Sequence, residues 1–503
     1  MKKRDDLFHL IKAMSKSEKR YFTLDAKKSS SKGSKYLVLF QAVNDMEIYD
    51  EAKLKKKFGK NLRYDKSYLY EAIMRSMRDY RSANSYAARI KEMILDAQYL
   101  YERSLYQQCG KRLEEAKELA KELDDQLSIL EINKLERLLL RQTKVKSYQE
   151  KMLDLIGAKD NSIKSLQLEM RYLDLLDNLV LEVDKRFSLK SENEIAEFHE
   201  KYPSSYFDLE QNNLKGRTQL RFFQSAAFYA QLLRRNEEVL GFYSKVVQWW
   251  DLNDKIKEDE FHKYVIDVST LLHAYSNKGD YHQILPLLKR LEEGTPKNQH
   301  DQGVVFQKTI IYRLLYYINT GSPIGVGELV QSVQEGLDKF QIKDSTKNVI
   351  IFNTSLMLFL QEKFQQCVDW NTRIMRGTKY ITRRDIRNGV LLLNLVAIYE
   401  LEEIERLEAF QRSVTRAFSK ERRSNVNNRF EVEVLTLLKA LFSAPPSEFK
   451  KLLVQFSLNL KNMKKDPDIR ISLGLDDLLF LWIRSKLERI PMVQQIQDQN
   501  AKT

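Results

Sequence analysis

Glycine and proline are scarce in this sequence of 503 residues, which contains 16 glycines and 8 prolines. Together they make up about 5% of the chain, whereas their average combined usage is roughly 12%. Because tight turns between short strands depend on these residues, a chain with so few of them has little room for many strands. Leucine, glutamate, lysine, glutamine and arginine, which favour helices, are abundant instead. The composition therefore predicts an all-α protein.

Cysteine and long apolar runs are scarcer still. Cys109 and Cys367 are the only two cysteines and belong to no CxxC or Cys/His cluster, so we expect neither a disulfide framework nor a zinc site, and a reducing compartment is favoured. The most apolar runs, 349–360 and 390–399, are shorter than the ~18 residues that a membrane helix requires. No signal-peptide pattern follows Met1. We expect a cytoplasmic protein that does not bind a membrane.

Patterns typical of catalysis are missing as well. The six histidines form no HExxH motif and have no second ligand at a metal-binding spacing. The glycines at 321, 325 and 327 lack the Gly-Lys-Ser/Thr sequence that cradles phosphate, and no carboxylate pair stands out as an acid–base couple. We therefore expect no catalytic residue, no metal, no cofactor and no small-molecule substrate.

Negative charge is in deficit, because 70 Asp and Glu face 84 Lys and Arg, which gives a formal net charge of +14. The excess is uneven: residues 1–80 hold 20 basic and 11 acidic side chains. Nearly two-thirds of the net charge thus lies in the first sixth of the chain. This asymmetry favours an acidic partner near the N-terminus.

Residues 1–88 are predicted to form a basic helical unit. Apolar residues at helical spacing indicate helices over about 7–14, 16–24, 36–46, 51–58 and 66–81, and Ser15-x-x-Glu18 has the form of a capping box. A short helix, a turn at 59–61 and a longer helix give the outline of a helix-turn-helix or winged-helix unit. Seven basic side chains crowd the short helix and the turn: Lys53, Lys55, Lys56, Lys57, Lys60, Arg63 and Lys66.

Two interpretations of these seven side chains remain open. They are numerous enough to neutralise several phosphates of DNA or RNA and so to give salt-dependent affinity. A solvated charged face on a helical cap would have the same composition, because a basic patch is only an electrostatic footprint. The charges among 66–81, which include Glu71 and Asp79, give no clear recognition-helix pattern.

From residue 89 onward the chain reads as one helix after another, and the clearest repeated unit spans 271–291. Here apolar positions on two helices flank a tight turn, and the residues that define the unit are Leu271, Tyr275, Gly279, Tyr281, Ile284 and Leu288. The unit resembles a tetratricopeptide motif, in which two antiparallel helices approach closely across a short turn.

Looser copies place a small or apolar residue where Ile284 stands in the clearest unit. These residues are Cys109, Val239 and Cys367, and the separations along the series 109, 239, 284 and 367 fit steps of about 42–45 residues. Weaker matches at five further places bring the number of hairpins to about nine. At this position the two cysteines would be buried and their thiols inert.

The resemblance implies a right-handed α-solenoid of about nine tetratricopeptide-like hairpins over 89–490, preceded by the helical unit 1–88 and followed by a polar tail, 491–503. Such arrays expose a concave surface that binds peptides and proteins. The first hypothesis is therefore a non-catalytic interaction scaffold or adaptor whose partner is an unknown protein or peptide. The alternative is a nucleic-acid-binding regulator, similar to bacterial regulators that join a helix-turn-helix to tetratricopeptide repeats. In it, the N-terminal unit contacts DNA or RNA and the solenoid senses a partner.

Overall fold

The computed structural model describes residues 5–28, 35–143, 146–186, 188–189, 191–207, 214–322, 325–377, 383–423, 427–466, 469, 471 and 473–501. Within these ranges the regular elements are 25 α-helices and short 3-10 turns, with no β-strand, which confirms the predicted all-α class. None of the described helices is both long and apolar enough to span a membrane. Contacts divide the chain into two compact units, 1–267 with 296–299 and 268–295 with 300–503.

The first unit opens with five helices around an apolar core of their own, which includes Ile11, Leu39 and Ile73. Their bounds are α1 (Asp6–Ala13), α2 (Lys16–Lys28), α3 (Lys35–Asn44), α4 (Glu51–Phe58) and α5 (Leu62–Ser82). The predicted capping box is present, since the Ser15 amide donates to Glu18 Oε2 (2.7 Å) and the Glu18 amide donates to Ser15 Oγ (3.2 Å). Helix α5 begins four residues earlier than the predicted start at 66, because Leu62 already packs into this core.

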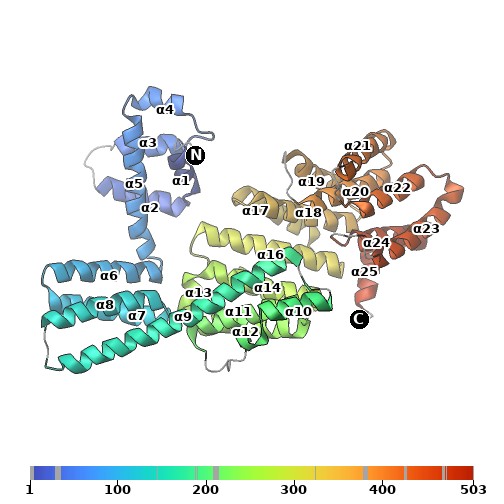
Figure 1. Ribbon diagram of the computed structural model, residues 1–503. Helices are drawn as coiled ribbons and strands as arrows, with labels where there is room; N and C mark the ends of the chain where they lie inside the picture. The colour runs from blue at the N-terminus through green and yellow to red at the C-terminus, as the bar shows by residue number, and fades with distance from the viewer. Residues whose placement is uncertain are drawn as a thin grey trace. The chain divides into compact units, whose positions relative to one another are not determined.

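The remaining helices of the first unit pack mainly against their neighbours in sequence, as Figure 1 shows for α6, α7 and α8. Their bounds are α6 (Tyr86–Glu102), α7 (Tyr106–Glu122), α8 (Gln126–Thr143), α9 (Tyr148–Arg186), α10 (Glu192–Lys201), η1 (Ser204–Phe207), α11 (Gly216–Leu232), α12 (Asn236–Leu252) and α13 (Asp254–Asp259). Helix α14 (Phe261–Lys278) follows and carries the boundary between the two units.

Helix α9 differs from the expected hairpin around 148–155, because 39 residues form one unbroken helix. Its early part accepts a hydrogen bond from Asn133 Nδ2 of α8 at the Leu155 carbonyl (2.8 Å). Its later part accepts one from Ser225 Oγ of α11 at the Tyr172 carbonyl (3.0 Å). The segment contains no proline and a single glycine, Gly157, so nothing in it interrupts the helix, and tertiary partners stabilise both parts.

The second unit consists of helices that pack mainly in adjacent pairs, and residues from Ile310 to Ile496 form one large apolar core within it. Their bounds are η3 (Tyr281–Gln283), α15 (Ile284–Glu292), α16 (Gln299–Thr320), α17 (Val326–Lys339), α18 (Asp344–Leu360), α19 (Phe364–Gly377), α20 (Arg384–Glu400), α21 (Ile404–Arg423), α22 (Arg429–Phe442), α23 (Pro446–Lys465), α24 (Leu475–Glu488) and α25 (Met492–Asn500).

The end of the described chain corrects one expectation. Residues 491–503 were predicted to be a polar tail, but 492–500 form α25, whose Met492 and Ile496 are buried in the core. Gln497 Nε2 also donates to the Gly321 carbonyl (2.7 Å). Two apolar residues four positions apart are enough to dock one face of a short helix. The glutamines around them make the segment look polar in the sequence.

Within the described ranges, six helices end in the same turn, in which a left-handed residue and one further residue precede the next helical element. The left-handed residues, with φ between +50° and +80°, are Ser104, Asp124, Arg234, Gly279, Glu362 and Glu402. In five of the six turns, the residue after the left-handed one donates its amide to the carbonyl five positions earlier, at 2.8–3.0 Å. This bond satisfies a carbonyl of the helix end. Five of the six left-handed residues carry a side chain, so a glycine does not mark the turn in the sequence.

The residues predicted to define the repeat occupy equivalent places after these turns. Cys109, Val239 and Cys367 are each the fourth residue of the helix that follows a turn, and Ile284 is the fourth residue counted from Tyr281. All four are buried, and so is Leu407, at the same place in α21. Leu271 and Leu288 of the clearest unit are buried as well, and Tyr275 and Tyr281 are half-buried.

The start of α11 joins the turn between α7 and α8 to the rest of the first unit. The Arg217 amide donates to Asp124 Oδ2 (2.6 Å), its Nε donates to the Leu123 carbonyl (3.0 Å), and its guanidinium pairs with Glu260 (2.8 Å). At Gly216, φ is +54° and an added Cβ would lie 2.0 Å from Asp124 Oδ2. Only glycine allows this approach.

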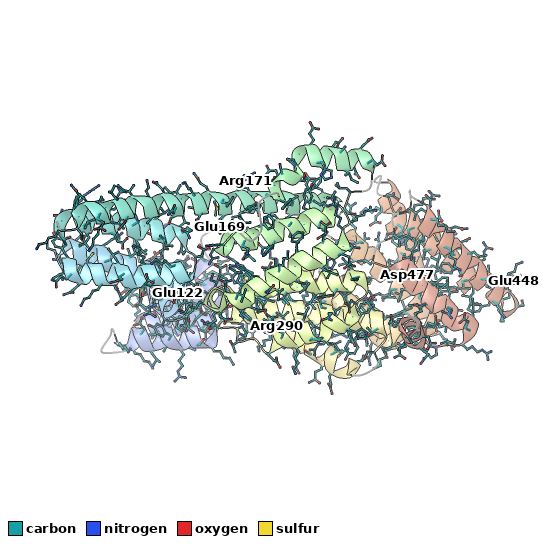
Figure 2. All side chains as sticks on the ribbon, turned by 90° about the horizontal axis from the view of Figure 1, so that it is seen from below. Glu122, Glu169, Arg171, Arg290, Glu448 and Asp477 are labelled. Carbon is teal, nitrogen blue, oxygen red and sulfur yellow. The ribbon has the colours of Figure 1, made fainter. Side chains whose placement is uncertain are left out.

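Several further side chains surround Arg217. Trp249 Nε1 donates to the Gly216 carbonyl (2.9 Å). Glu169 of α9, labelled in Figure 2, is buried, and its burial raises the pKa of its carboxyl group, although Arg217 and Arg221 oppose the shift. The end of α7 is tied to α13 by the Glu122–Lys255 ion pair (2.5 Å). This junction combines three helix ends with one buried guanidinium.

The shared turn predicts opposite effects for two substitutions in the second unit. Glu402→Gly should raise the free energy of unfolding by about 0.5–1 kcal/mol, because glycine adopts left-handed φ without the steric cost of a Cβ. Gly279→Ala should lower it by about 1 kcal/mol for the same reason. Urea unfolding curves for the two variants test both signs.

Glu403→Gly is the matched control, since Glu403 is adjacent but is not left-handed. There glycine brings no relief from strain, so this variant should be no more stable than the wild type. Equal effects of Glu402→Gly and Glu403→Gly would contradict the steric account of the turn.

Candidate functional site

The seven basic residues singled out in the sequence lie on α4, on the turn after it and on the first turns of α5. Asp50 caps α4 by accepting from the Lys53 amide (3.0 Å), and Gly59, with φ +74°, ends it. Leu54 is buried on one side of this short helix, and Lys53, Lys56 and Lys57 are exposed. Because positions i, i+3 and i+4 share a helix face, these three lysines lie on one side of α4.

The two acidic residues among 51–67 are already engaged within the unit. Glu51 pairs with Lys55 (3.4 Å), and the buried Asp65 pairs with Lys35 of α3 (2.6 Å). Lys66 Nζ is 2.6 Å from the Tyr49 hydroxyl. The other five basic side chains are exposed and have no carboxylate within 4 Å in the part of the chain that the structure describes: Lys53, Lys56, Lys57, Lys60 and Arg63.

Two exposed tyrosines adjoin these basic side chains, and the sequence analysis did not single them out. Tyr64 is 78% exposed and Tyr68 is 48% exposed. The ring of Tyr68 stacks on Tyr36 of α3, with centroids 4.1 Å apart, and Arg75 lies over it at 5.9 Å. The signal in the sequence was their i, i+4 spacing on the side of α5 opposite its buried stripe.

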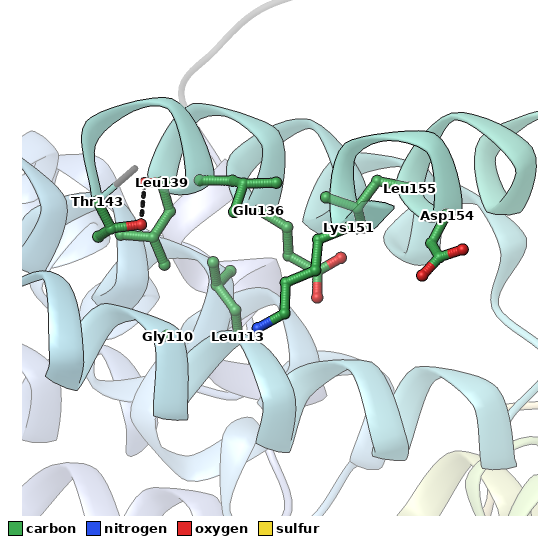
Figure 3. A pocket seen from close by; sticks show the side chains of 9 residues that line it. Gly110, Leu113, Glu136, Leu139, Thr143, Lys151, Asp154 and Leu155 are labelled. Carbon is green, nitrogen blue, oxygen red and sulfur yellow. Dashed lines mark hydrogen bonds between the residues drawn. The ribbon is translucent and has the colours of Figure 1, made fainter. Parts of the chain in front are cut away.

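A groove of about 350 Å³ lies between α7, α8 and α9 (Figure 3). Leucines of the three helices, Leu113, Leu139, Leu140 and Leu155, form its apolar wall. Its polar members are Glu136, Thr143, Lys151 and Asp154, and Gly110 leaves space at the α7 side. Lys151 extends from α9 toward α7 (Figure 3). No linear motif encodes this groove, because its residues come from three helices.

A fully buried carboxyl group lies where α11, α12 and α14 meet. Asp267 accepts from Trp250 Nε1 (2.7 Å) and from Gln224 Nε2 (2.9 Å). Burial raises the pKa of Asp267 to about 6, although these hydrogen bonds and the charges of Arg221 and Lys263 oppose the shift. The group is closed off from solvent, so its partners give it a packing role and not contact with a substrate.

The two cysteine side chains are also held in the core. Cys109 and Cys367 are free and buried, and burial raises the pKa of both thiols, which disfavours the nucleophilic thiolate. Burial lowers the pKa of His273. In the described ranges, no three or more His, Cys, Asp or Glu side chains are grouped as metal ligands.

Two later arginine-rich runs, 373–387 and 412–429, are partly neutralised. Arg383 pairs with Asp385, Arg387 with Glu421, and Arg429 with Asp466. Lys379 lies outside the described residues. These pairs distinguish the two runs from the basic side chains of α4 and α5.

No protein-family model matches this chain, and no curated protein or solved structure is significantly similar to it.

The raised pKa of Asp267 predicts a specific pH dependence of stability. A carboxyl group with a raised pKa in the folded state stabilises the fold below its unfolded pKa, and that contribution is lost as the pH rises through the folded value near 6. Asp267→Asn removes this titration. From pH 4 to pH 7, the free energy of unfolding of the variant should therefore improve by roughly 2 kcal/mol relative to the wild type.

Urea unfolding followed by tryptophan fluorescence at several pH values measures this difference, since Trp250 contacts the group directly. Parallel stability curves for the two proteins across this range would show that the carboxyl group titrates normally in the fold.

Proposed function

We propose that this chain is a non-catalytic interaction scaffold that holds a peptide or protein partner on a right-handed α-solenoid of tetratricopeptide-like hairpins. The observation that carries the proposal is the recurrence of one turn at six helix ends. Five of these turns are followed directly by a helix, and the turn at Gly279 is followed by the 3-10 turn η3, which leads into α15. A buried residue at the fourth place after five of these turns supports the same interpretation. Units of this kind bury a shared core by stacking and leave an extended surface for binding.

The spacing of the turns supports a long repeat in part of the chain. The left-handed residues Arg234, Gly279, Glu362 and Glu402 are separated by 45, 83 and 40 positions, which corresponds to one, two and one steps of a period near the proposed 42–45 residues. Ser104 and Asp124 are only 20 apart, because successive helices of the α6–α8 group use the same turn. The long helix α9 occupies much of the interval between Asp124 and Arg234.

The groove between α7, α8 and α9 is the proposed docking place for an apolar side chain of the partner. Its apolar walls would exclude water from such a side chain, and the charged groups at Glu136, Lys151 and Asp154 would orient the partner backbone or its polar neighbours. We place the scaffold in the cytoplasm, because its two cysteines are free and buried. The proposed scaffold carries out no catalytic step.

The test is affinity purification of the tagged full-length chain from its native cell extract, with and without nuclease, followed by mass spectrometry. Thr143→Trp fills the groove from its rim and should reduce recovery of the partner at least about tenfold, since an anchor side chain that is excluded loses most of its binding energy. The proposal expects one defined protein that survives nuclease and is lost with this variant.

Thr436→Trp on α22 is the matched control. Like Thr143, Thr436 is exposed and donates its hydroxyl to the carbonyl four residues earlier. This variant should retain the partner. Equal loss with both variants, or disappearance of every protein partner after nuclease treatment, would contradict the proposed scaffold.

A further inference from the structure

We propose that the exposed face formed by α4, the turn at 59–61 and the first turns of α5 binds double-stranded DNA, with α5 in the major groove. This DNA-binding face is defined by Lys53, Lys56, Lys57, Lys60, Arg63, Tyr64, Ser67 and Tyr68. It is separate from the groove between α7, α8 and α9, and it does not depend on the scaffold function.

This face keeps a net positive charge after its own ion pairs are counted. Residues 51–67 contain seven basic and two acidic side chains. Both acidic residues are engaged, Glu51 with Lys55 and Asp65 with Lys35, which is contributed by α3. Asp65 is also buried and cannot offset charge at the surface. The face therefore presents five exposed cations and fits a polyanion such as the phosphate backbone.

Helix α5 exposes one side along its first turns. Its buried residues, Leu62, Asp65, Leu69, Ile73 and Ser76, follow one stripe along the helix. The opposite side is exposed from the turn onward, at Lys60, Arg63, Tyr64, Ser67, Tyr68 and Glu71. An α-helix with its side chains is about 10–12 Å across, and the major groove of B-DNA is about 12 Å wide. The exposed first turns of α5 therefore have the dimensions that groove entry needs.

The two helices carry different chemical groups. Lys53, Lys56 and Lys57 share one side of the short helix α4 and carry flexible point charges, which suit phosphate oxygens. The start of α5 carries a guanidinium at Arg63 and hydroxyl groups at Tyr64 and Ser67, which can donate to base edges in the major groove. Backbone contacts from one helix and base contacts from the next are the usual arrangement when two helices are joined by a short turn.

Held aromatic side chains support the same assignment. Tyr68 is stacked on Tyr36, so its ring is oriented before any ligand arrives. Glu71, one turn further, is an exposed carboxylate, which phosphate groups would repel. This limits the proposed contact to about the first three turns of the helix.

Duplex DNA is favoured over duplex RNA by the shape of the grooves. The major groove of A-form RNA is deep and too narrow for a helix to enter. A face that acts only through charge would bind the two duplexes similarly, because both carry dense phosphate. Insertion of α5 predicts discrimination between them.

The experiment measures fluorescence anisotropy of the full-length protein with a labelled DNA duplex of about 24 base pairs and mixed sequence, and with the RNA duplex of the same sequence, over a range of salt concentrations. The proposal expects DNA to bind at least about tenfold more tightly than RNA. It also expects affinity for DNA to fall steeply with salt. Equal affinity for the two duplexes, or no binding of DNA at low salt, would overturn it.

Two variants locate the contact. Lys53→Gln, Lys56→Gln and Lys57→Gln combined should weaken DNA binding at least about tenfold and reduce the slope of log affinity against log salt by about 2–3, since each phosphate contact contributes about 0.9. Arg63→Ala should reduce the preference for DNA over RNA by several-fold. The slope of log affinity against log salt should change by no more than the contribution of one phosphate contact.

The control combines Lys111→Gln, Lys134→Gln and Lys164→Gln, which removes the same charge from three exposed lysines on α7, α8 and α9. This variant should bind DNA within about threefold of the wild type, because exposed charges beyond the contact are screened by salt. If the control and the α4 variant weaken binding equally, net charge and not this face is responsible. All substituted side chains are exposed, and thermal melting by circular dichroism verifies that each variant is folded.

Discussion

The rest of this structure depends on one constraint at the helix ends. The chain must reverse within a few residues, and the last carbonyl groups of the helix must still find hydrogen-bond donors. The solution is the same at six helix ends: a left-handed residue, usually followed by an amide that bonds five positions back. After five of the six turns, the fourth residue of the element that follows is buried. Cys109, Ile284 and Cys367 are among these residues, although their side chains differ in size and chemistry. The turn thus determines which residue of the next helix becomes core.

Burial of charge has different consequences in different parts of the chain. At the start of α11, Arg217 is compensated by Glu260 and by the carbonyl of Leu123, so its charge stabilises a junction between helix ends. At Asp267 the surrounding groups donate hydrogen bonds, but burial still dominates and raises the pKa. Among residues 51–67 the two acidic residues form ion pairs within the unit, and five basic side chains stay exposed. The positive charge of residues 51–67 therefore remains at the surface instead of being neutralised within the unit.

Much of the helical layout could be predicted, because apolar residues three and four positions apart indicate one face of a helix. The range 51–58 agrees with α4 to the residue, and the capping box at Ser15 and Glu18 is present. The prediction failed where a distant partner extends or docks a helix. Helix α9 stays unbroken while α8 and α11 support its two parts, and Met492 and Ile496 draw the expected tail into the core. The groove between α7, α8 and α9 was also beyond prediction, since its residues are brought together only by packing.

The sequence by itself determined the all-α class, the positions of most N-terminal helices and the concentration of basic residues among 53–66, because composition and short-range periodicity are local properties. Tertiary structure alone decided that Asp65 would be buried against Lys35, that Tyr68 would be held by Tyr36, and that Gly216 would face Asp124 without room for a Cβ. Each of these outcomes depends on which distant side chain arrives within a few ångströms. That proximity results from packing, so it cannot be predicted from the spacing of residues along the chain.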